Sequence, residues 1–456
     1  MEANEKNQFD EKILGELSNI VLAKGPINPE LYRKYEVKRG LRDADGRGVL
    51  VGLTEIGEVH SYILDEGEMI PVPGRLIYRG YDILDLAKGF MEDGRFGFEE
   101  TIYLLLFGNL PSSQQLADFK QLLTNNQKLP ENFARDIILS APSKDIMNGL
   151  ARSVLALYSF DANPDDISIK NVLKQCIKLI AFFPSLAAYS FQAYSHYYGN
   201  KSLVLHSPQP HLGLAENILY MLRPNHKYTE LEAKLLDLAL VLHAEHGGGN
   251  NSTFVTHVVT STGTDTYSVI AAALGSLKGP RHGGANHKVI QMIENIKENV
   301  KDWEDNAELS AYLDRLLTKD AFDHSGLIYG IGHAVYSISD PRAVILKRYA
   351  AMLAKEKGLE HEFNLYAKVE ELSQKAIAKH THSNKAVSAN VDYYSGFVYR
   401  MLNLPLEMFT PIFALARIAG WSAHRIEEIV NNGKIIRPAY KSVEPRRLYV
   451  PLNERG

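Results

Sequence analysis

Several ionisable side chains in this sequence stand beside glycine or proline, where a turn exposes backbone to a ligand. One of them is His282 in the run Gly279–Asn286, which is followed at helical spacing by Val289, Met292 and Ile293. We therefore predict His282 at the N-terminal end of a helix, whose dipole disfavours the imidazolium form and keeps the ring neutral. A neutral imidazole can donate a hydrogen bond to a carbonyl oxygen. A histidine bonded only within its own turn is the simpler alternative.

Two further histidines, His243 and His246, stand at the end of a helix that we predict over Glu230–His243. That helix begins with a capping box, Thr229-x-x-Glu232, and it ends before three glycines. Histidines three residues apart could bind a metal ion, but neither a cysteine cluster nor the HExxH pattern accompanies them. We therefore expect no metal at this pair, and we expect His246 to bond a ligand or to cap backbone.

The run Gly330-Ile331-Gly332-His333 lies shortly before Asp340-Pro341-Arg342. Two glycines at this spacing could belong to a dinucleotide-binding loop. The third glycine of that motif and the strand before it are both missing, so we do not favour a dinucleotide site here. Asp340 and Pro341 are typical of a helix start, with Asp as the cap and Pro at the first helical position. Arg342 would then lie in the first turn with its guanidinium free to bind a carboxylate, unless it is an ordinary solvated arginine.

Three charged residues nearer the C-terminus complete the set: Asp392, Arg417 and Arg437. Asp392 precedes an apolar helical stretch, where an aspartate is most often a cap, and the nearby Ser395 lacks the GxSxG elbow of a serine hydrolase. Arg417 stands inside an apolar helix and therefore needs an anionic partner, while Arg437 is a cation beside a proline. Together these residues favour a small polycarboxylate substrate and acid–base chemistry at a carbonyl.

Composition excludes several other classes of protein. The 456 residues carry a net charge of −4, so the chain lacks the basic field that nucleic acid or anionic lipid would select. A single cysteine, Cys176, allows no disulfide within the chain and fits the reducing cytosol. The acidic N-terminus has no signal or transit pattern, and the apolar stretch Leu179–Phe191 is short and interrupted by Pro184. We therefore expect a cytoplasmic protein with no membrane span.

Periodicity indicates mostly helices. We expect a surface arm over residues 1–45 with a short helix at Glu11–Ala23, then a small strand region over Gly48–Ile63 and Met69–Tyr78. From Ile83 onward helical patterns dominate. They are separated by short breaks that we place at Pro130, Pro142, Pro164, Pro184, Pro208 and Pro210. The expected fold is all-α with a minor N-terminal β region.

A change to more charged helices after His282 suggests a second domain. We expect a large helical domain over residues 46–284 and 391–456, and a smaller helical domain over residues 285–390. The residues with candidate chemistry then lie on both.

The motifs that carry this chemistry resemble those of the citrate synthase family. They are HAEHGGGNNS, GPRHGGAN, GIGHAVYSISDPR, NVDYYSG, a later arginine in the C-terminal apolar helix, and RPAY. The resemblance covers nearly the whole chain, with the N-terminal arm as its least diagnostic part. It implies an acyltransferase that condenses acetyl-CoA with oxaloacetate. The acyl group of acetyl-CoA would become an alkyl group on transfer. Citryl-CoA would then be hydrolysed in the same site.

The resemblance also implies a role for each motif residue. Asp392 would be the base that takes a methyl proton from acetyl-CoA, His282 the donor to the enol or enolate oxygen, and His333 the group that polarises the ketone. The oxaloacetate carboxylates would be bound by His246, Arg342 and Arg417, together with Arg437 from the partner subunit of a homodimer. CoA would contact backbone at Ile328, Gly330, Ile331 and Gly332, and the side chain of Lys385. No metal or other cofactor is implied, and the small domain would close over the large one.

Lys385 is the weakest of these assignments. The run His382–Ala389 departs from the sequence common at this place in the family.

Three other functions compete with this one. A 2-methylcitrate synthase performs the same chemistry on propionyl-CoA, which is larger by one methylene, a difference of only ~1–3 kcal/mol in a pocket. A non-catalytic paralogue would bind ligands without turnover, although all seven key positions are intact. The third is a metal-binding helical protein built on His243 and His246.

Overall fold

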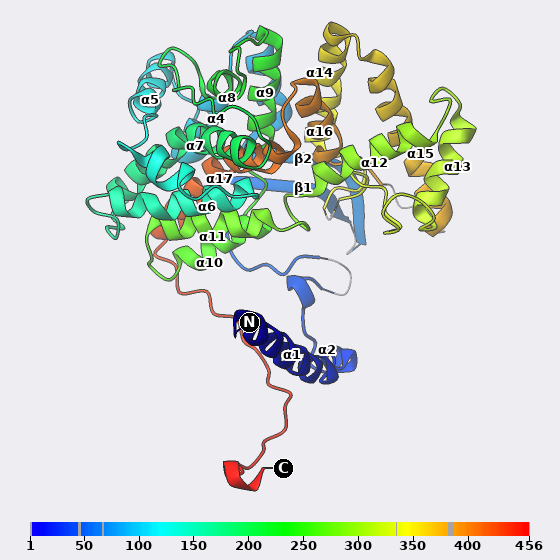
Figure 1. The fold of residues 1–456 in the computed structure, drawn as a ribbon. Helices are drawn as coiled ribbons and strands as arrows, with labels where there is room; N and C mark the ends of the chain where they lie inside the picture. Colours follow the sequence, from blue (N-terminus) through cyan, green and yellow to red (C-terminus); the bar gives the residue numbers. More distant parts are fainter. Residues whose placement is uncertain (1, 44–46, 66–67, 334, 382–386, 456) are drawn as a thin grey trace. The chain divides into compact units, whose positions relative to one another are not determined.

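Helices make up most of the chain, and the described strands form one small sheet (Figure 1). The computed structural model describes residues 2–43, 47–65, 68–333, 335–381 and 387–455. It confirms the predicted all-α fold with a minor β region. The chain divides into two compact units, Met1–Leu53 and Thr54–Gly456.

The first unit contains α1 (Glu2–Ala23), α2 (Pro29–Lys34) and a 3₁₀ turn, η1 (Arg39–Leu41). α1 extends beyond the predicted helix at its N-terminal end, because no glycine or proline separates Glu2 from Glu11. α2 starts where its sequence indicates: the Asn28 side chain accepts the N–H of Glu30, and Pro29 occupies the first helical position.

The sheet is an antiparallel meander of β1 (Gly57–Asp65), β2 (Glu68–Tyr78) and β3 (Tyr81–Asp82). Residues 49–56 lie outside it, so the predicted start at Gly48 is wrong. The hydroxyl of the buried Tyr78 donates to the carbonyls of Val241 and Glu245 at 3.0 Å each. This tyrosine joins the sheet to the C-terminal end of α9, where two candidate site histidines lie.

Local caps fix the ends of several of the next helices, and α9 has the predicted boundaries. α4 ends at Gly108, whose φ of 88° is left-handed, and the capping box of Thr229 and Glu232 starts α9. The elements of this part are α3 (Ile83–Glu92), α4 (Phe98–Phe107), α5 (Ser113–Asn125), the π-helical turn η2 (Ala134–Leu139), α6 (Ile146–Leu157), η3 (Tyr158–Phe160), α7 (Ile169–Tyr197), α8 (Leu214–Leu222), α9 (Glu230–His243), α10 (Asn251–Thr260) and α11 (Thr266–Lys278).

α7 corrects one predicted break, because it runs through Pro184 as a single helix. Proline in a helix interior removes one hydrogen bond and costs about 3 kcal/mol. Nearly every residue around Pro184 is buried, and this packing outweighs the loss. Among the described helices, α7 alone is long and apolar enough to cross a bilayer, but 78% of its apolar window is buried inside the protein. Cys176, on the same helix, is buried.

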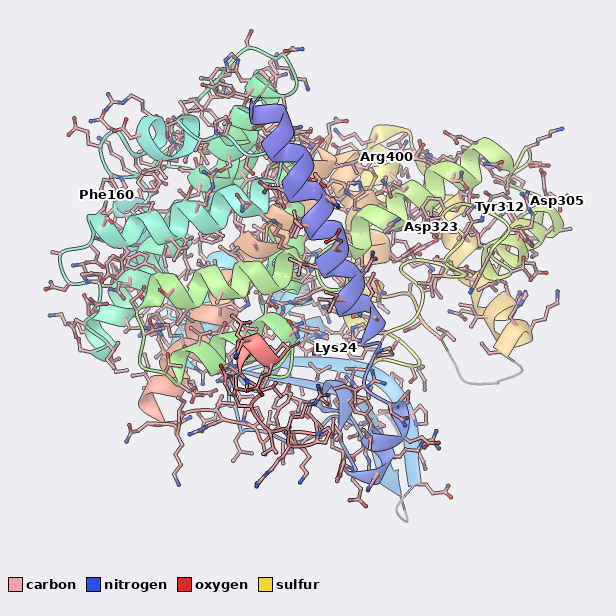
Figure 2. The ribbon with its side chains drawn as sticks, turned by 60° about the horizontal axis from the view of Figure 1, so that its bottom comes forward. Lys24, Phe160, Asp305, Tyr312, Asp323 and Arg400 are labelled. Carbon is pink, nitrogen blue, oxygen red and sulfur yellow. The ribbon has the colours of Figure 1, made fainter. Side chains whose placement is uncertain are left out.

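The remaining elements are α12 (Ala285–Asn299), α13 (Asn306–Leu317), α14 (Pro341–Lys357), α15 (Glu360–Thr381), α16 (Val391–Met401), η4 (Leu406–Met408), α17 (Phe409–Val430) and η5 (Leu452–Glu454). Helices α12–α16 gather on one side of the second unit, whereas α17 runs among α4, α7, α9 and α10 (Figure 1). Asp305 caps α13, and Tyr312 on that helix donates its hydroxyl to Asn295 of α12 (Figure 2). The Tyr312 bond joins α13 to its neighbour α12.

Candidate active site

Arg417 lies at the centre of the candidate site, on a stretch of α17 that is buried on every face. Its side chain is 0% exposed, and its Nε donates to the carbonyl of His243 at 2.7 Å. Nη1 and Nη2 are also buried, and neither has a hydrogen-bond partner among the described residues. Burial lowers the pKa of Arg417 to about 10, although the nearby Glu245 carboxylate opposes this. A buried guanidinium with two unused nitrogens is suited to bind an anion.

His243 and His246 line the same centre from the end of α9. His243 stacks on Phe413 with ring centroids 4.5 Å apart, and His246 lies 5.4 Å from the ring of His333. The pKa of both rings is well below the usual value, first because of burial and then because of Arg342. Nε2 of His246 is buried without a partner among the described residues. A neutral His246 therefore has a donor or acceptor available for a ligand.

His282 lies in the turn between α11 and α12, three residues before the start of α12 rather than in its first turn. Its Nε2 accepts the N–H of Ser252 at 3.4 Å and lies 3.0 Å from Ser252 Oγ. Because Ser252 is in the first turn of α10, the helix end that faces the ring belongs to α10. A backbone N–H can only donate, so the ring proton is assigned to Nδ1.

The predicted neutrality of His282 is confirmed, but its main cause differs from the one predicted. Burial lowers the pKa of His282 to about 4, and the positive charge of Arg417 adds to the effect. The ring is therefore a neutral Nδ1–H donor near pH 7.

The segment before His333 is held against the segment before α16. The N–H of Gly332 donates to the carbonyl of Ser388 at 2.8 Å, and the N–H of Asn390 donates to the carbonyl of Gly330 at 2.9 Å. Gly330 has a φ of +80°, and a Cβ there would lie 2.8 Å from side-chain atoms of Tyr393. Only glycine fits at this position. This pairing brings the loop of His333 next to the start of the helix that carries Asp392.

His333 has a defined orientation. Its Nδ1 accepts the N–H groups of Val335 and Tyr336 at 3.0 and 3.1 Å, so the proton belongs on Nε2. Its ring lies 4.8 Å from the ring of Tyr336. Nε2 of His333 is thus a hydrogen-bond donor.

Asp392 is not the cap of α16, although its place in the sequence suggests one. Asn390 takes that role, since its Oδ1 accepts the N–H of Asp392 at 3.0 Å. Burial raises the pKa of Asp392 to about 6, against the opposing effect of Arg342. A carboxylate with this pKa is a good general base near neutral pH. Ser395, on the same helix, is fully buried, which does not suit a nucleophile.

The guanidinium of Arg342 is not free, contrary to the sequence-based expectation. Its Nε and Nη2 donate to the two carboxylate oxygens of Asp340, at 3.0 and 2.7 Å. Asp340 also accepts the N–H of Val391 at 3.1 Å, so it links the start of α14 to the start of α16. Nη1 is the nitrogen of Arg342 not bonded to Asp340. Sequence reasoning missed this positioning role because it took Asp340 only as a cap, which it also is.

Several of the predicted site residues meet around Arg417. Its charge acts on the pKa of three of them, His246, His282 and Asp392. Arg437 does not join them within the chain: it is exposed in the segment that follows α17. Lys385 lies outside the described residues.

The fold and the site define an all-α protein in which a buried arginine with two unpartnered nitrogens lies among oriented histidine rings and a carboxyl group whose burial raises its pKa. A sequence model described as "Citrate synthase, C-terminal domain" matches residues 41–439. The citrate synthase of Synechocystis sp. is 35% identical, over 84% of this chain and 88% of that protein. The 2-methylcitrate synthase 1 of Corynebacterium glutamicum is 31% identical, over 92% of this chain and 99% of that protein.

A solved structure agrees with these relatives. It is the ternary complex of carboxymethyl coenzyme A and oxaloacetate with the citrate synthase of Thermoplasma acidophilum, with a TM-score of 0.74 and 28% identity over 92% of this chain and 99% of that one. The chain belongs to the citrate synthase family.

Proposed function

We propose that this protein is a citrate synthase, which condenses acetyl-CoA with oxaloacetate to give citrate and CoA. The observation that carries the proposal is the pair of unused, buried guanidinium nitrogens of Arg417 beside His246 and Asp392. A dicarboxylate would satisfy the guanidinium, and the carboxyl of Asp392 is poised to exchange a proton near neutral pH.

The reaction follows from the donors and the base. Asp392 takes a proton from the methyl group of acetyl-CoA, while Nδ1–H of His282 stabilises the enol or enolate oxygen. Nε2–H of His333 polarises the ketone of oxaloacetate, and the enolate carbon attacks that ketone carbon. The ketone oxygen gains a proton to become the hydroxyl of citryl-CoA, which balances the methyl proton taken by Asp392. Water then cleaves the thioester of citryl-CoA, which releases CoA and citrate.

Oxaloacetate is bound through its two carboxylates by His246, Arg342 and Arg417. The bidentate bond to Asp340 fixes the guanidinium plane of Arg342, so its remaining Nη1 has a defined direction. Buried arginines suit this task because their planar group matches a carboxylate.

Arg437 would act in the site of a partner subunit, which makes a homodimer part of this proposal. The segment that carries it is exposed, including apolar side chains such as Tyr440 at 96% and Leu448 at 93%. Exposed apolar side chains of this kind are typical of a protein–protein interface.

CoA would contact the backbone of Ile328, Gly330, Ile331 and Gly332, and also Lys385. Residues 285–390 would form a small domain that closes over the rest and excludes water from the enolate. We further propose a cytoplasmic enzyme, in keeping with its net charge of −4 and single cysteine.

The alternative is a 2-methylcitrate synthase, which is favoured by the relative of that name in Corynebacterium glutamicum. Its substrate, propionyl-CoA, is larger than acetyl-CoA by one methylene. A difference of one methylene changes the ratio of the two kcat/KM values by only about 10–200-fold.

Release of free CoA thiol tests the reaction and the substrate together. We expect release from acetyl-CoA only when oxaloacetate is present, and a higher kcat/KM for acetyl-CoA than for propionyl-CoA. A preference for propionyl-CoA would establish the alternative. No release from either thioester would indicate a non-catalytic paralogue.

A further inference from the structure

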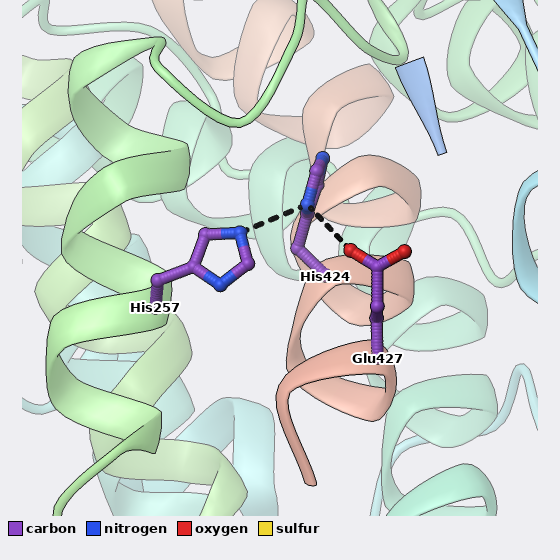
Figure 3. A group of neighbouring side chains, drawn as sticks. All are labelled: His257, His424 and Glu427. Atoms are coloured by element: carbon purple, nitrogen blue, oxygen red, sulfur yellow. Dashed lines mark hydrogen bonds and ion pairs between the residues drawn. The ribbon is translucent and has the colours of Figure 1, made fainter. Parts of the chain in front are cut away.

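A second cluster of histidines and carboxylates lies between α10 and α17, outside the site described above (Figure 3). His257 belongs to α10, and His424 and Glu427 belong to α17. One ligand atom from each residue lies within 4.8 Å of the other two. The His424 side chain is 0% exposed, that of Glu427 10% and that of His257 13%. Three groups that bind metals thus meet in a largely buried place.

The outer nitrogen of each imidazole faces a carboxylate. Nδ1 of His257 lies 2.7 Å from Oε2 of Glu428, and Nε2 of His424 lies 3.0 Å from Oε1 of Glu245. A carboxylate can only accept, so Nδ1 of His257 carries the ring proton. The charge of the Glu245 carboxylate favours the proton on Nε2 of His424, but these two atoms do not have hydrogen-bond geometry.

With the proton of His424 on Nε2, both inner nitrogens are lone-pair acceptors, and they face each other. Nε2 of His257 and Nδ1 of His424 are 3.0 Å apart (Figure 3). Two neutral rings oriented in this way have no proton to share between them. A positive charge at this point would remove the repulsion.

Glu427 adds a third acceptor. Its Oε1 accepts the N–H of Glu55 at 2.8 Å. Its Oε2 is buried, lies 3.8 Å from Nδ1 of His424, and has no hydrogen-bond donor among the described residues. Burying an unpaired carboxylate oxygen costs folding free energy. A bound cation would offset this cost.

We propose that His257, His424 and Glu427 bind a divalent transition-metal ion of the Zn²⁺ type. Two imidazoles and one carboxylate are a ligand set that zinc takes in proteins. Metal-bound histidines donate their other N–H to a carboxylate, and Glu428 and Glu245 stand where those acceptors belong. The expectation of no metal rested on His243 and His246, which take no part here.

The geometry needs small adjustments. Ligand atoms about 2.0–2.1 Å from a tetrahedral ion are about 3.3 Å from one another. The two imidazole nitrogens at 3.0 Å would therefore separate slightly, and the Glu427 oxygen at 3.8 Å would approach His424.

The ion would cross-link two helices that hold the candidate active site. α10 carries Ser252, which bonds His282, and α17 carries Arg417. It lies beside the substrate groups rather than among them, so its role is structural. We therefore expect it to stabilise the fold and to take no direct part in the reaction.

The test uses the full-length chain, dialysed against a chelator and then titrated with zinc chloride. We expect one zinc per chain by elemental analysis after gel filtration, and an anomalous-scattering peak between the three ligands at the zinc edge. Zinc in about 100-fold excess over its dissociation constant should raise Tm by about 3 °C. Glu428→Gln should weaken binding about 10–100-fold, because it changes the acceptor behind His257.

His257→Gln removes a ligand and should abolish this zinc binding. The matched control is His206→Gln, because His206 also lies beside a second histidine, His226, with ring centroids 3.9 Å apart. That variant should bind zinc as the unaltered chain does.

Three results would overturn the proposal: a wild-type chain that keeps no zinc, a peak at another place, or equal affinity in His257→Gln. If a proton rather than a metal occupies the gap, the first of these is observed. Should His257→Gln fail to fold, Glu427→Gln replaces it, because its amide oxygen can still accept the N–H of Glu55. Unchanged zinc affinity in the folded Glu427→Gln chain would equally reject the site.

Discussion

Asp392 is half-buried. Burial raises the pKa of its carboxyl group, the charge of Asp340 raises it further, and the charge of Arg342 lowers it. The carboxylate is the active form of a general base, so activity depends on its deprotonated fraction. With a pKa of about 6, kcat/KM for acetyl-CoA should fall as the pH drops through about 6, whereas an unshifted aspartate would stay ionised to about pH 4. Asp392→Asn should lower kcat by about 100-fold or more while oxaloacetate binding changes little. An acid limb near pH 4, or near-normal turnover in the variant, would contradict this role.

The same residue sets a pH dependence of stability. Because burial raises its pKa from 3.8 to about 6, the folded state binds the proton more tightly than the unfolded chain does. The contribution of Asp392 to folding is therefore lost as the pH rises from about 4 to 6. Above pH 6, Asp392→Asn should be more stable than the unaltered protein by at most about 3 kcal/mol, and the gap should vanish at pH 4. Urea unfolding at pH 8 and pH 4 measures the difference, and an equal gap at both would show that another effect dominates.

Arg417 and Arg425 offer a matched comparison on one helix. Both are buried in α17, but the nitrogens of Arg425 donate to Thr266, Thr260 and the carbonyl of Thr264, whereas two nitrogens of Arg417 have no such partner among the described residues. Arg417→Leu should raise KM for oxaloacetate about 100-fold or more, because a buried charge contact to substrate is lost. Arg425→Leu should lower stability and leave KM in place. Steady-state kinetics of the two folded variants would decide, and equal KM values would refute the assignment.

At the scale of elements, the turn at Gly330 holds the His333 loop against the start of α16. Gly330→Ala would force a side chain into left-handed backbone and against Tyr393, so we expect a loss of about 1–3 kcal/mol in the free energy of unfolding. Gly275→Ala in α11 is the control, since nothing lies within 4 Å of the added methyl group. It should gain about 0.5–1 kcal/mol. Thermal unfolding of both variants tests the idea, and equal effects would exclude strain at Gly330.

Helix boundaries depend on packing as well as on local pattern. Capping at Thr229 acts within one turn of chain, so α9 has the predicted bounds. Proline at position 184 predicts a helix break. α7 nevertheless continues through Pro184, because the residues around it are buried on every face of the helix. The strand β1 likewise begins later than the pattern from Gly48 indicates.

For the whole molecule, the proposed homodimer makes a sharp prediction about Arg437. Arg437→Ala and Asp392→Asn chains should each be nearly inactive as homodimers. When the two are co-expressed, a mixed dimer contains one site with both groups intact, so about one quarter of the normal activity should return. If Arg437 served its own chain, mixing would restore nothing.

The sequence by itself determined the helical architecture, the family and the residue types of the site. These depend on spacing and capping within a few residues and on motifs that are continuous in the chain. Only the tertiary structure decided what each group touches. It showed that Asp340 occupies the guanidinium of Arg342, that Ser252 of α10 faces His282, and that His257 meets His424. The partners of His282 and His257 lie 30 and 167 residues away in the chain. Burial raises the pKa of Asp392 and leaves two nitrogens of Arg417 without a hydrogen-bond partner among the described residues. It arises only when distant helices pack, and no local pattern records it.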